Sequence, residues 1–144
     1  MKHIKTEIII EASSEKIWNV LMDFKNYGKW NPFILKINGV KKEGKRLKVN
    51  IQPPNGKKMT FRPVIIKLEK EKVFRWIGRL GVKGVFDGEH YFELISEDEN
   101  KTRFIHGEKF TGILVATAGK AIEKTKQGFD LMNIALKEKC EEDS

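Results

Sequence analysis

The chain has 144 residues, of which 40% are hydrophobic and 33% are charged, a composition typical of one folded domain with its own core. Its single cysteine, Cys140, excludes an internal disulfide and any site built from several cysteines, and we expect it to be a small core residue. No apolar run is long enough to span a membrane, and the N-terminal segment lacks the pattern of a cleavable signal. We therefore expect a cytoplasmic protein with one domain over residues 1–144.

The net charge of +8 is unevenly distributed along the chain. Residues 1–83 hold 20 of the 28 Lys and Arg but only 7 of the 20 Asp and Glu, a balance of +13, whereas residues 84–144 carry −5. A basic patch that binds nucleic acid or an anionic surface is one interpretation. We favour a solvated surface, because the lysines are scattered among predicted strands, and we expect no nucleic-acid partner.

The N-terminal part of the chain predicts a strand and two short helices. Residues 3–11 alternate between apolar and polar side chains, which indicates a strand with one buried face. A helix follows from Ser13 or Ser14, either of which can cap it, to about Asp23. The aromatic segment 24–33 predicts one helical turn and then a break.

Strand and turn signals dominate the middle of the chain. Six alternating segments are separated by turns, with no helical pattern between them, which predicts an antiparallel meander. They cover residues 33–38, 47–51, 59–68, 73–80, 85–94 and 103–110.

The C-terminal part has helical periodicity. Apolar residues recur every three or four positions over residues 114–140, which predicts one long amphipathic helix. At about 1.5 Å per residue, such a helix can cross a whole seven-stranded sheet. A twisted sheet curls around a helix of that length, and the space between them suits a concave apolar pocket. The sequence thus predicts an α+β fold.

Three motifs carry more specific information. Residues 12–33 combine a small-residue cap, a helix with Trp18 and Leu21, an Asp-Phe pair and a Trp-Asn-Pro turn, and shorter motifs occupy residues 88–94 and 108–112. In these motifs, and in element order over its whole length, the chain resembles the helix-grip superfamily, often labelled SRPBCC. That superfamily includes START lipid-transfer domains, the birch pollen allergen and bacterial polyketide cyclases.

The resemblance implies a particular architecture. A curved seven-stranded antiparallel sheet would wrap around the long C-terminal helix, with two short helices after the first strand. A deep cavity between sheet and helix would hold an apolar small molecule. The resemblance implies no universal catalytic residue, and a chaperone-binding branch of the superfamily leaves protein partners open. Fold alone does not decide among these functions.

Aromatic residues are the first candidates for the cavity wall. Trp30 and Phe33 lie where the short helices meet the second strand, and they form either a rim of the cavity mouth or a structural plug. Trp76 and Leu80 share one strand face and are expected to point at the helix. Strand parity and helical spacing direct three further residues to the same internal space: Phe92, Phe129 and Met132.

The polar candidates are His90, His106 and Glu108. With the hairpin turn centred at Asp98, His90 faces His106 and Gly88 faces Glu108 on the concave side. Desolvated there, these groups have perturbed pKa values and can act as general acid and base, orient the polar head of a ligand, or form a structural polar cluster. Nothing in the spacing demands a metal, and we expect neither a metal nor a cofactor.

Charged residues of the opposite parity are expected on the outer face of the sheet, where they form cross-strand ion pairs. The basic members are Arg75, Arg79, Arg103 and Lys109, and the acidic members are Asp87, Glu89 and Glu93. Arg62 is an exception, because it shares parity with Val64 and can reach inward to bind an acidic ligand head.

The leading hypothesis is that the chain binds or transports a hydrophobic small molecule, lipid-like or aromatic, without catalysis, because no nucleophilic triad is recognisable. One alternative is a cyclase- or hydratase-type enzyme that uses His90, His106 and Glu108. The other is a module that binds a protein or an anionic surface through its basic half. The sequence leaves a homodimer open.

Overall fold

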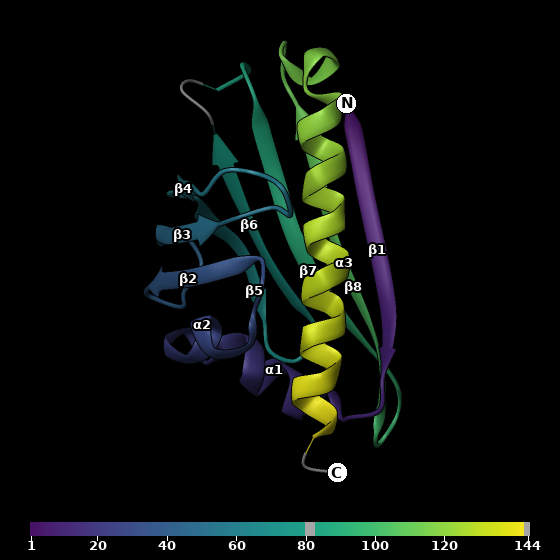
Figure 1. The fold of residues 1–144 in the computed structure, drawn as a ribbon. Coiled ribbons are helices and arrows are strands. Elements are labelled where there is room, and N and C mark those ends of the chain that lie inside the picture. Colours follow the sequence, from purple (N-terminus) through teal and green to yellow (C-terminus); the bar gives the residue numbers. More distant parts are fainter. Residues whose placement is uncertain (80–82, 143–144) are drawn as a thin grey trace.

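The computed structural model describes residues 1–79 and 83–142. Within them, eight strands form two antiparallel sheets, with the orders β1-β8-β7-β6-β5 and β2-β3-β4 (Figure 1). The strands are β1 (Lys2–Ile10), β2 (Ile34–Gly39), β3 (Leu47–Ile51), β4 (Met59–Phe61), β5 (Val64–Glu69), β6 (Val73–Arg79), β7 (Asp87–Asp98) and β8 (Lys101–Thr111). The predicted α+β class is confirmed.

Two short helices follow β1, as predicted. The first, α1 (Ser14–Met22), begins after Ser13, whose side-chain oxygen accepts a hydrogen bond from the backbone N–H of Lys16 at 3.1 Å. A 3-10 turn, η1 (Phe24–Asn26), leads into the single-turn helix α2 (Tyr27–Trp30). Both helices lie toward one end of the two sheets (Figure 1).

The long helix α3 (Gly119–Glu141) starts five residues later than the predicted residue 114. A 3-10 turn, η2 (Val115–Thr117), precedes it. Leu114 and Ala118 keep a near-helical spacing because a 3-10 turn repeats about every three residues. A prediction from periodicity alone therefore begins the helix too early. None of the helices in the described ranges combines the length and apolar character needed to cross a membrane.

Pro63 divides the predicted strand 59–68 into β4 and β5, which belong to different sheets. Proline has no N–H to donate to a strand ladder. Its carbonyl accepts the N–H of Leu47 at 2.8 Å, and the N–H of Ile65 donates to the carbonyl of Lys45 at 2.9 Å. The two sheets therefore meet at this corner, and the seven predicted strands become eight in the described residues.

The β7–β8 hairpin is shifted by two residues from the predicted register. Its turn lies at residues 99–100 and is not centred at Asp98. His90 therefore lies opposite Glu108 and not opposite His106. Because the shift is even, the same side chains still face the concave side.

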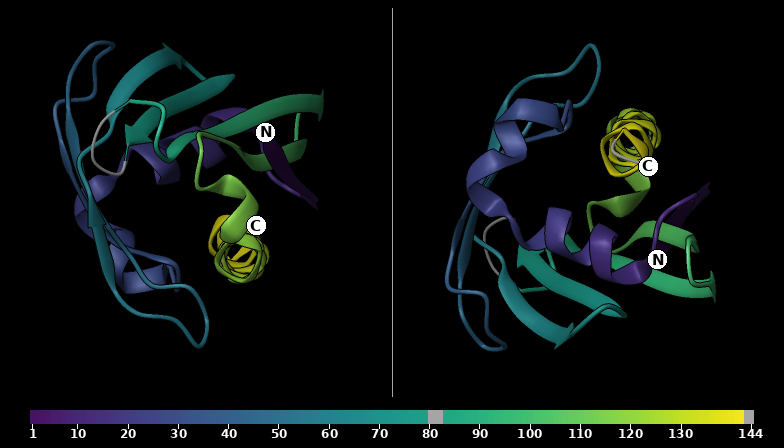
Figure 2. Two further views of the ribbon diagram at one scale, coloured as in Figure 1. Left: turned by 90° about the horizontal axis from the view of Figure 1, so that it is seen from above. Right: turned by 90° about the horizontal axis from the view of Figure 1, so that it is seen from below.

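The concave face of the five-stranded sheet is covered by α3, and the three-stranded sheet forms a second wall (Figure 1 and Figure 2). At Gly128, the ring of Phe33 lies directly against the helix, where a Cβ would collide with it. Cys140 is buried at the end of the helical stripe, as predicted. The other buried side chains of the stripe are Ile122, Phe129, Met132, Asn133 and Leu136.

The predicted cross-strand ion pairs of Arg75, Arg79 and Arg103 are confirmed in the five-stranded sheet, whereas Lys109 makes no ion pair with the described residues. The Arg75 guanidinium donates to Glu89 at 2.9 Å and to Glu93 at 3.0 Å. Arg79 lies 3.8 Å from Asp87. These pairs give the positive charges of β6 acidic partners on β7.

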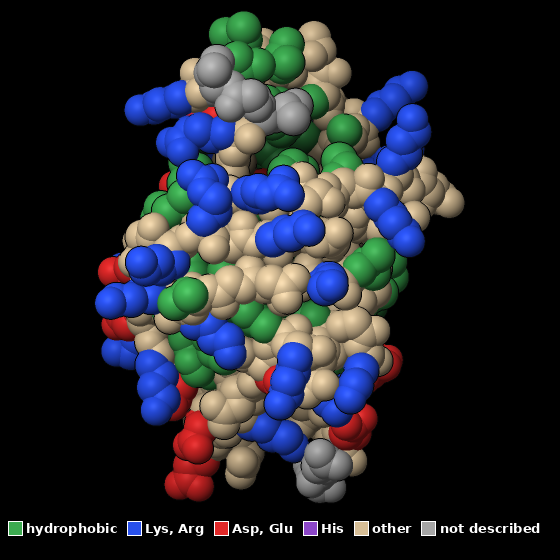
Figure 3. All heavy atoms as spheres, turned by 90° about the vertical axis from the view of Figure 1, so that its left-hand side faces the viewer, with side chains coloured by type: hydrophobic (Ala, Val, Ile, Leu, Met, Phe, Trp, Pro, Cys, Tyr) green, Lys and Arg blue, Asp and Glu red, His purple; other side chains and the backbone are tan. Residues whose placement is uncertain are grey.

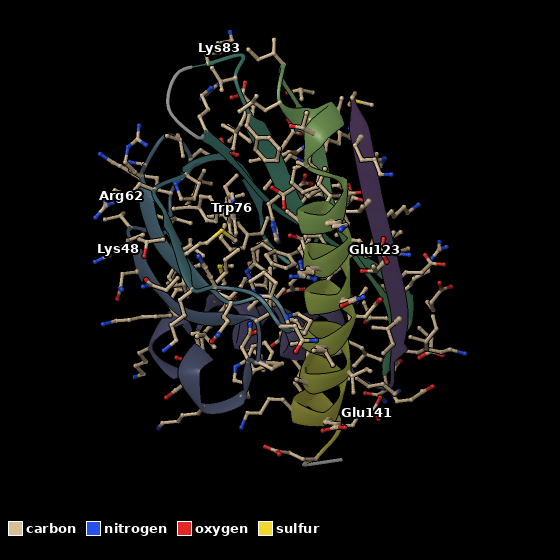
Figure 4. All side chains as sticks on the ribbon, turned by 45° about the horizontal axis from the view of Figure 1, so that its top comes forward. Lys48, Arg62, Trp76, Lys83, Glu123 and Glu141 are labelled. Atoms are coloured by element: carbon tan, nitrogen blue, oxygen red, sulfur yellow. The ribbon has the colours of Figure 1, made fainter. Side chains whose placement is uncertain are left out.

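The outer face of the three-stranded sheet is basic (Figure 3). Residues 34–62 contain nine Lys and Arg but one acidic residue, Glu43. Arg62 is exposed and lies at the outer edge of the molecule (Figure 4), so the prediction that it reaches inward is wrong. The corner at Pro63 interrupts the strand after it, and parity with Val64 does not carry across that corner.

Candidate functional site

A cavity of about 350 Å³ lies between the two sheets and the N-terminal half of α3. That volume is within the range of small-molecule binding sites. Both sheets and the helix contribute to the wall, and most of the lining side chains are apolar. They include Val49, Ile51, Phe61, Trp76, Phe110 and Ile122. Such a wall favours an apolar ligand, because contact with it removes apolar surface from water.

The cavity opens between β4 and the first turns of α3. Met59 and Leu114 line it there and keep 40% and 42% of their surface exposed. Thr117 and Ala121 also line this end and are exposed. Toward the interior, the buried Trp76 lies between α3 and the three-stranded sheet (Figure 4). The cavity thus runs from an open apolar mouth to a closed inner end.

The structure brings Phe33 and Trp76 to the cavity wall, together with His90 and Glu108. Trp30 does not line the cavity; it packs against Tyr27, with ring centroids 5.4 Å apart. Leu80 lies outside the described residues. The remaining four predicted residues are buried in the packed core and do not line the cavity: Phe92, His106, Phe129 and Met132.

A chain of buried hydrogen bonds starts at the closed end. Oε1 of Glu108 lies 3.2 Å from Nδ1 of His90, and Nε2 of His90 lies 2.8 Å from Nε2 of His106. Nδ1 of His106 lies 3.0 Å from Oδ1 of Asn133, and Nδ2 of Asn133 donates to Oγ1 of Thr6 at 2.8 Å. We call these five residues the polar relay. It connects β7, β8, α3 and β1 through side chains alone.

Aromatic rings hold both imidazoles of the polar relay in place. Trp76 stacks on His90 with ring centroids 4.7 Å apart, and Phe129 stacks on His106 at 3.9 Å. Each imidazole therefore has a flat apolar neighbour on one face and hydrogen bonds at both nitrogens. The rings are fixed in orientation and kept from water.

Burial makes the polar relay electrically neutral at pH 7. It lowers the pKa of His90 to about 3. It also lowers the pKa of His106 well below 6.5, an effect to which His90 adds and which the hydrogen bond to Asn133 opposes. Burial raises the pKa of Glu108 to about 8. The contact between Glu108 and His90 therefore joins a neutral carboxylic acid to a neutral imidazole and is not an ion pair.

Only two members of the polar relay, Glu108 and His90, border the cavity. Both nitrogens of His90 already have partners. Within residues 1–79 and 83–142, no group of three or more His, Cys, Asp or Glu is arranged to hold a metal ion. At the closed end, the carboxyl of Glu108 is therefore a polar group with capacity left for a ligand.

Known proteins share this architecture. The family model described as "Polyketide cyclase / dehydrase and lipid transport" matches residues 1–141. The chain belongs to this family. No curated protein matches the sequence.

Several solved structures share the fold of this chain. A START superfamily protein from Mycobacterium smegmatis has a TM-score of 0.79 at 16% identity, over 99% of both chains. The Zhui aromatase/cyclase from Streptomyces sp. R1128 has a TM-score of 0.72 at 15% identity, over 97% of this chain and 93% of that one. The di-domain ARO/CYC BexL has a TM-score of 0.72 at 11% identity, and 95% of this chain covers 45% of it. Identities this low show the fold alone.

Two residues of the polar relay, Asn133 and Thr6, were not singled out from the sequence. Asn133 follows Phe129 by four positions and is therefore a polar residue within the apolar stripe of α3. Thr6 lies between Ile4 and Ile8 on the inward face of β1. In both cases the available signal is a polar side chain on a face that is otherwise apolar.

Proposed function

We propose that the chain binds an uncharged, largely apolar small molecule in the cavity between its two sheets and α3. The observation that carries this proposal is the cavity itself, about 350 Å³ in volume and lined mainly by apolar side chains. Membership of a family whose description includes lipid transport supports it. An accessible mouth at Met59 and Leu114 gives such a ligand a route to the interior.

Binding without catalysis is favoured by the state of the two histidines. His106 lies behind the cavity wall, and both nitrogens of His90 and of His106 are engaged within the polar relay. A general acid or base must reach the proton that it transfers. Of the three polar residues predicted from the sequence, Glu108 is the one that meets the ligand in this proposal, because it borders the cavity and keeps one carboxyl oxygen without a partner among the described residues.

The proposal is tested by the fluorescence of N-phenyl-1-naphthylamine, an uncharged apolar dye that brightens on burial. The native chain is expected to bind it saturably with one site. Ala121→Trp places a large ring at the cavity mouth and is expected to weaken binding at least about tenfold. Lys120→Trp adds the same ring to an exposed neighbour that does not line the cavity and is the matched control. Equal binding by both variants contradicts the proposal.

A second candidate is a cyclase- or hydratase-type reaction with Glu108 as the acid. The observation that favours it is the raised pKa of Glu108, about 8, at the closed end of the cavity. A reaction that needs the protonated carboxyl would slow as the pH rises through about 8, and Glu108→Gln would abolish it. Turnover that is insensitive to Glu108→Gln would dismiss this candidate.

A further inference from the structure

We propose that the cavity selects apolar molecules that carry a hydroxyl group, an alcohol or a phenol, over carboxylates and over analogues without a hydroxyl. The ligand hydroxyl donates its hydrogen to Oε2 of Glu108. This inference rests on the proposed function, because it takes the cavity as the binding site. It follows from the direction of the hydrogen bonds in the polar relay.

The direction is set at the end of the relay that lies farthest from the cavity. Oγ1 of Thr6 lies 2.8 Å from the backbone carbonyl oxygen of His106. A carbonyl only accepts, so the single hydroxyl hydrogen of Thr6 is donated to it. Oγ1 must then accept from Asn133 at 2.8 Å, which requires the amide nitrogen on that side. The amide oxygen of Asn133 therefore faces His106.

Each following step is determined by the one before it. The oxygen of Asn133 accepts from His106, so His106 carries its hydrogen on Nδ1. A neutral imidazole has one N–H, and Nε2 of His106 must accept from Nε2–H of His90. Nδ1 of His90 is then an acceptor as well. Its neighbour at 3.2 Å, Oε1 of Glu108, has to be the donor.

The consequence for Glu108 is that one oxygen donates and the other is left to accept. Oε1 gives its hydrogen to His90, and Oε2 receives no hydrogen bond from the described residues. Gly88 borders Oε2 so closely that a Cβ there would collide with it, and both residues line the cavity. The Glu108 side chain is 16% exposed, against 6% for His90. The cavity therefore ends at an uncharged acceptor.

Two threonine hydroxyls also line the wall. Thr117 and Thr125 donate their hydroxyl hydrogens to backbone carbonyls at 2.9 Å, so toward a ligand their oxygens, like Oε2 of Glu108, can only accept. Arg79 is exposed and lies 3.8 Å from Asp87. A carboxylate ligand has no hydrogen for Oε2 and would have to leave a charge in a desolvated site. A ketone or an ether also has no hydrogen to donate, whereas an alcohol or phenol has one.

Three naphthalene derivatives of similar size test this selection by displacement of bound N-phenyl-1-naphthylamine. We expect 2-naphthol to bind about tenfold more tightly than 2-methoxynaphthalene, the gain of roughly one hydrogen bond. We expect 2-naphthoate to displace no dye at the same concentrations. Equal affinities for 2-naphthol and 2-methoxynaphthalene, or tight binding of 2-naphthoate, would overturn the inference.

Two substitutions at Glu108 test the geometry. In Glu108→Gln, the amide nitrogen can donate to His90 and the amide oxygen takes the place of Oε2, so the preference for 2-naphthol is expected to be retained. Glu108→Leu removes the acceptor and is expected to erase the preference while the dye still binds. Glu123→Gln changes an exposed residue of α3 (Figure 4) and serves as the matched control.

The outcomes separate this inference from the proposed function. A preference for 2-naphthol that survives in Glu108→Leu overturns the inference, and saturable dye binding leaves the proposed function standing in that case. Loss of dye binding by the native chain contradicts the proposed function itself. If Glu108→Leu does not fold, the three naphthalene derivatives on the native chain and on Glu108→Gln decide the inference.

Discussion

A buried polar group costs free energy unless its hydrogen bonds are made, and each side-chain link of the polar relay meets this condition through its neighbour. Thr6 and Asn133 are the structural end of the relay, and Glu108 is the end that faces the cavity. Hydrogen bonds that all point the same way strengthen one another. The orientation of Glu108 is thus coupled to residues that a ligand never touches.

Asn133→Leu is expected to lower the free energy of unfolding by about 1–3 kcal/mol, because it leaves the buried N–H of His106 and the oxygen of Thr6 without their partner. Urea unfolding followed by tryptophan fluorescence measures the change. Gln127→Leu makes a similar change at an exposed position of the same helix, where the effect is expected to stay within about 0.5 kcal/mol. Equal effects at the two positions would show that the Asn133 hydrogen bonds contribute no stability.

The polar relay also predicts how stability depends on pH. His90 and His106 have lowered pKa values, so the unfolded chain binds more protons than the folded one below about pH 6.5, and stability falls as the pH falls. Glu108 has a raised pKa, so the folded chain keeps a proton that the unfolded chain has lost between about pH 4.5 and 8. Stability therefore falls as the pH rises toward 8. For these three groups the maximum lies near pH 6.5.

The alkaline decline is expected to come from Glu108. The contribution of Glu108 by itself should be close to about 1.4 kcal/mol per pH unit between pH 6 and 7, the value for one proton, and about half that near pH 8, where half of the folded chains have lost the proton. Glu108→Gln cannot titrate, so the difference between native and variant unfolding free energies should change by that slope. Parallel pH profiles for the two proteins would mean that Glu108 is already ionised at neutral pH.

At the scale of elements, the sequence predicted the order and type of strands and helices because alternation and helical spacing are strong over residues 3–11, 85–110 and 119–140. Inward parity holds within an unbroken strand, where it brought His90 and Glu108 to the correct side, but it failed for Arg62 across the corner at Pro63. Details set by turns were harder. The register depended on a two-residue turn, and parity survives any even shift.

Periodicity could not predict the features that depend on long-range packing. A proline within a strand pattern indicates an irregularity, but only the structure shows that the Pro63 carbonyl accepts the N–H of Leu47 and so joins two sheets there. The cavity ends at Glu108 and His90, where Phe92 and Phe129 pack against the two imidazoles; Met132 is fully buried and does not line the cavity. Alternation predicts that such side chains point inward, but it does not predict which of them border a cavity.

Gly128 illustrates how packing overrides helix propensity. Gly128→Ala would favour the helix by about 1 kcal/mol from propensity alone, but the new Cβ collides with the ring of Phe33. We expect a net loss of about 1–3 kcal/mol. Gly119→Ala is the matched control, since its Cβ would meet no atom within 4 Å, and it is expected to be neutral or stabilising. A higher melting temperature for both variants would contradict the close packing of Phe33 on α3.

At the scale of the whole molecule, the outer faces of the two sheets differ in charge balance. The five-stranded sheet pairs its charges across strands, as Arg75 does with Glu89 and Glu93. The three-stranded sheet presents its Lys and Arg to solvent (Figure 3), with Glu43 the one acidic residue in residues 34–62. Like charges held together reduce stability through mutual repulsion, and dissolved salt screens that repulsion.

Lys48→Glu, on the exposed face of β3, is therefore expected to raise the free energy of unfolding by a few tenths of a kcal/mol at low salt. Its advantage should shrink near 0.5 M salt, where the screening length is only about 4 Å. Lys101→Glu reverses a charge beside Glu97, Asp98 and Glu99 and is expected to lower the free energy of unfolding at low salt. Melting curves at two salt concentrations compare the variants. A destabilised Lys48→Glu at low salt would contradict the account of this face.

The central claim is that the cavity ends in a neutral, one-directional polar relay, and the nitrogen chemical shifts of its histidines test this most directly. Long-range proton–nitrogen NMR spectra distinguish the two neutral tautomers of an imidazole from each other and from the cation. At pH 7 we expect His106 to carry its hydrogen on Nδ1 and His90 to carry its hydrogen on Nε2, with both rings uncharged. A cationic ring, or the same tautomer in both rings, would contradict the account.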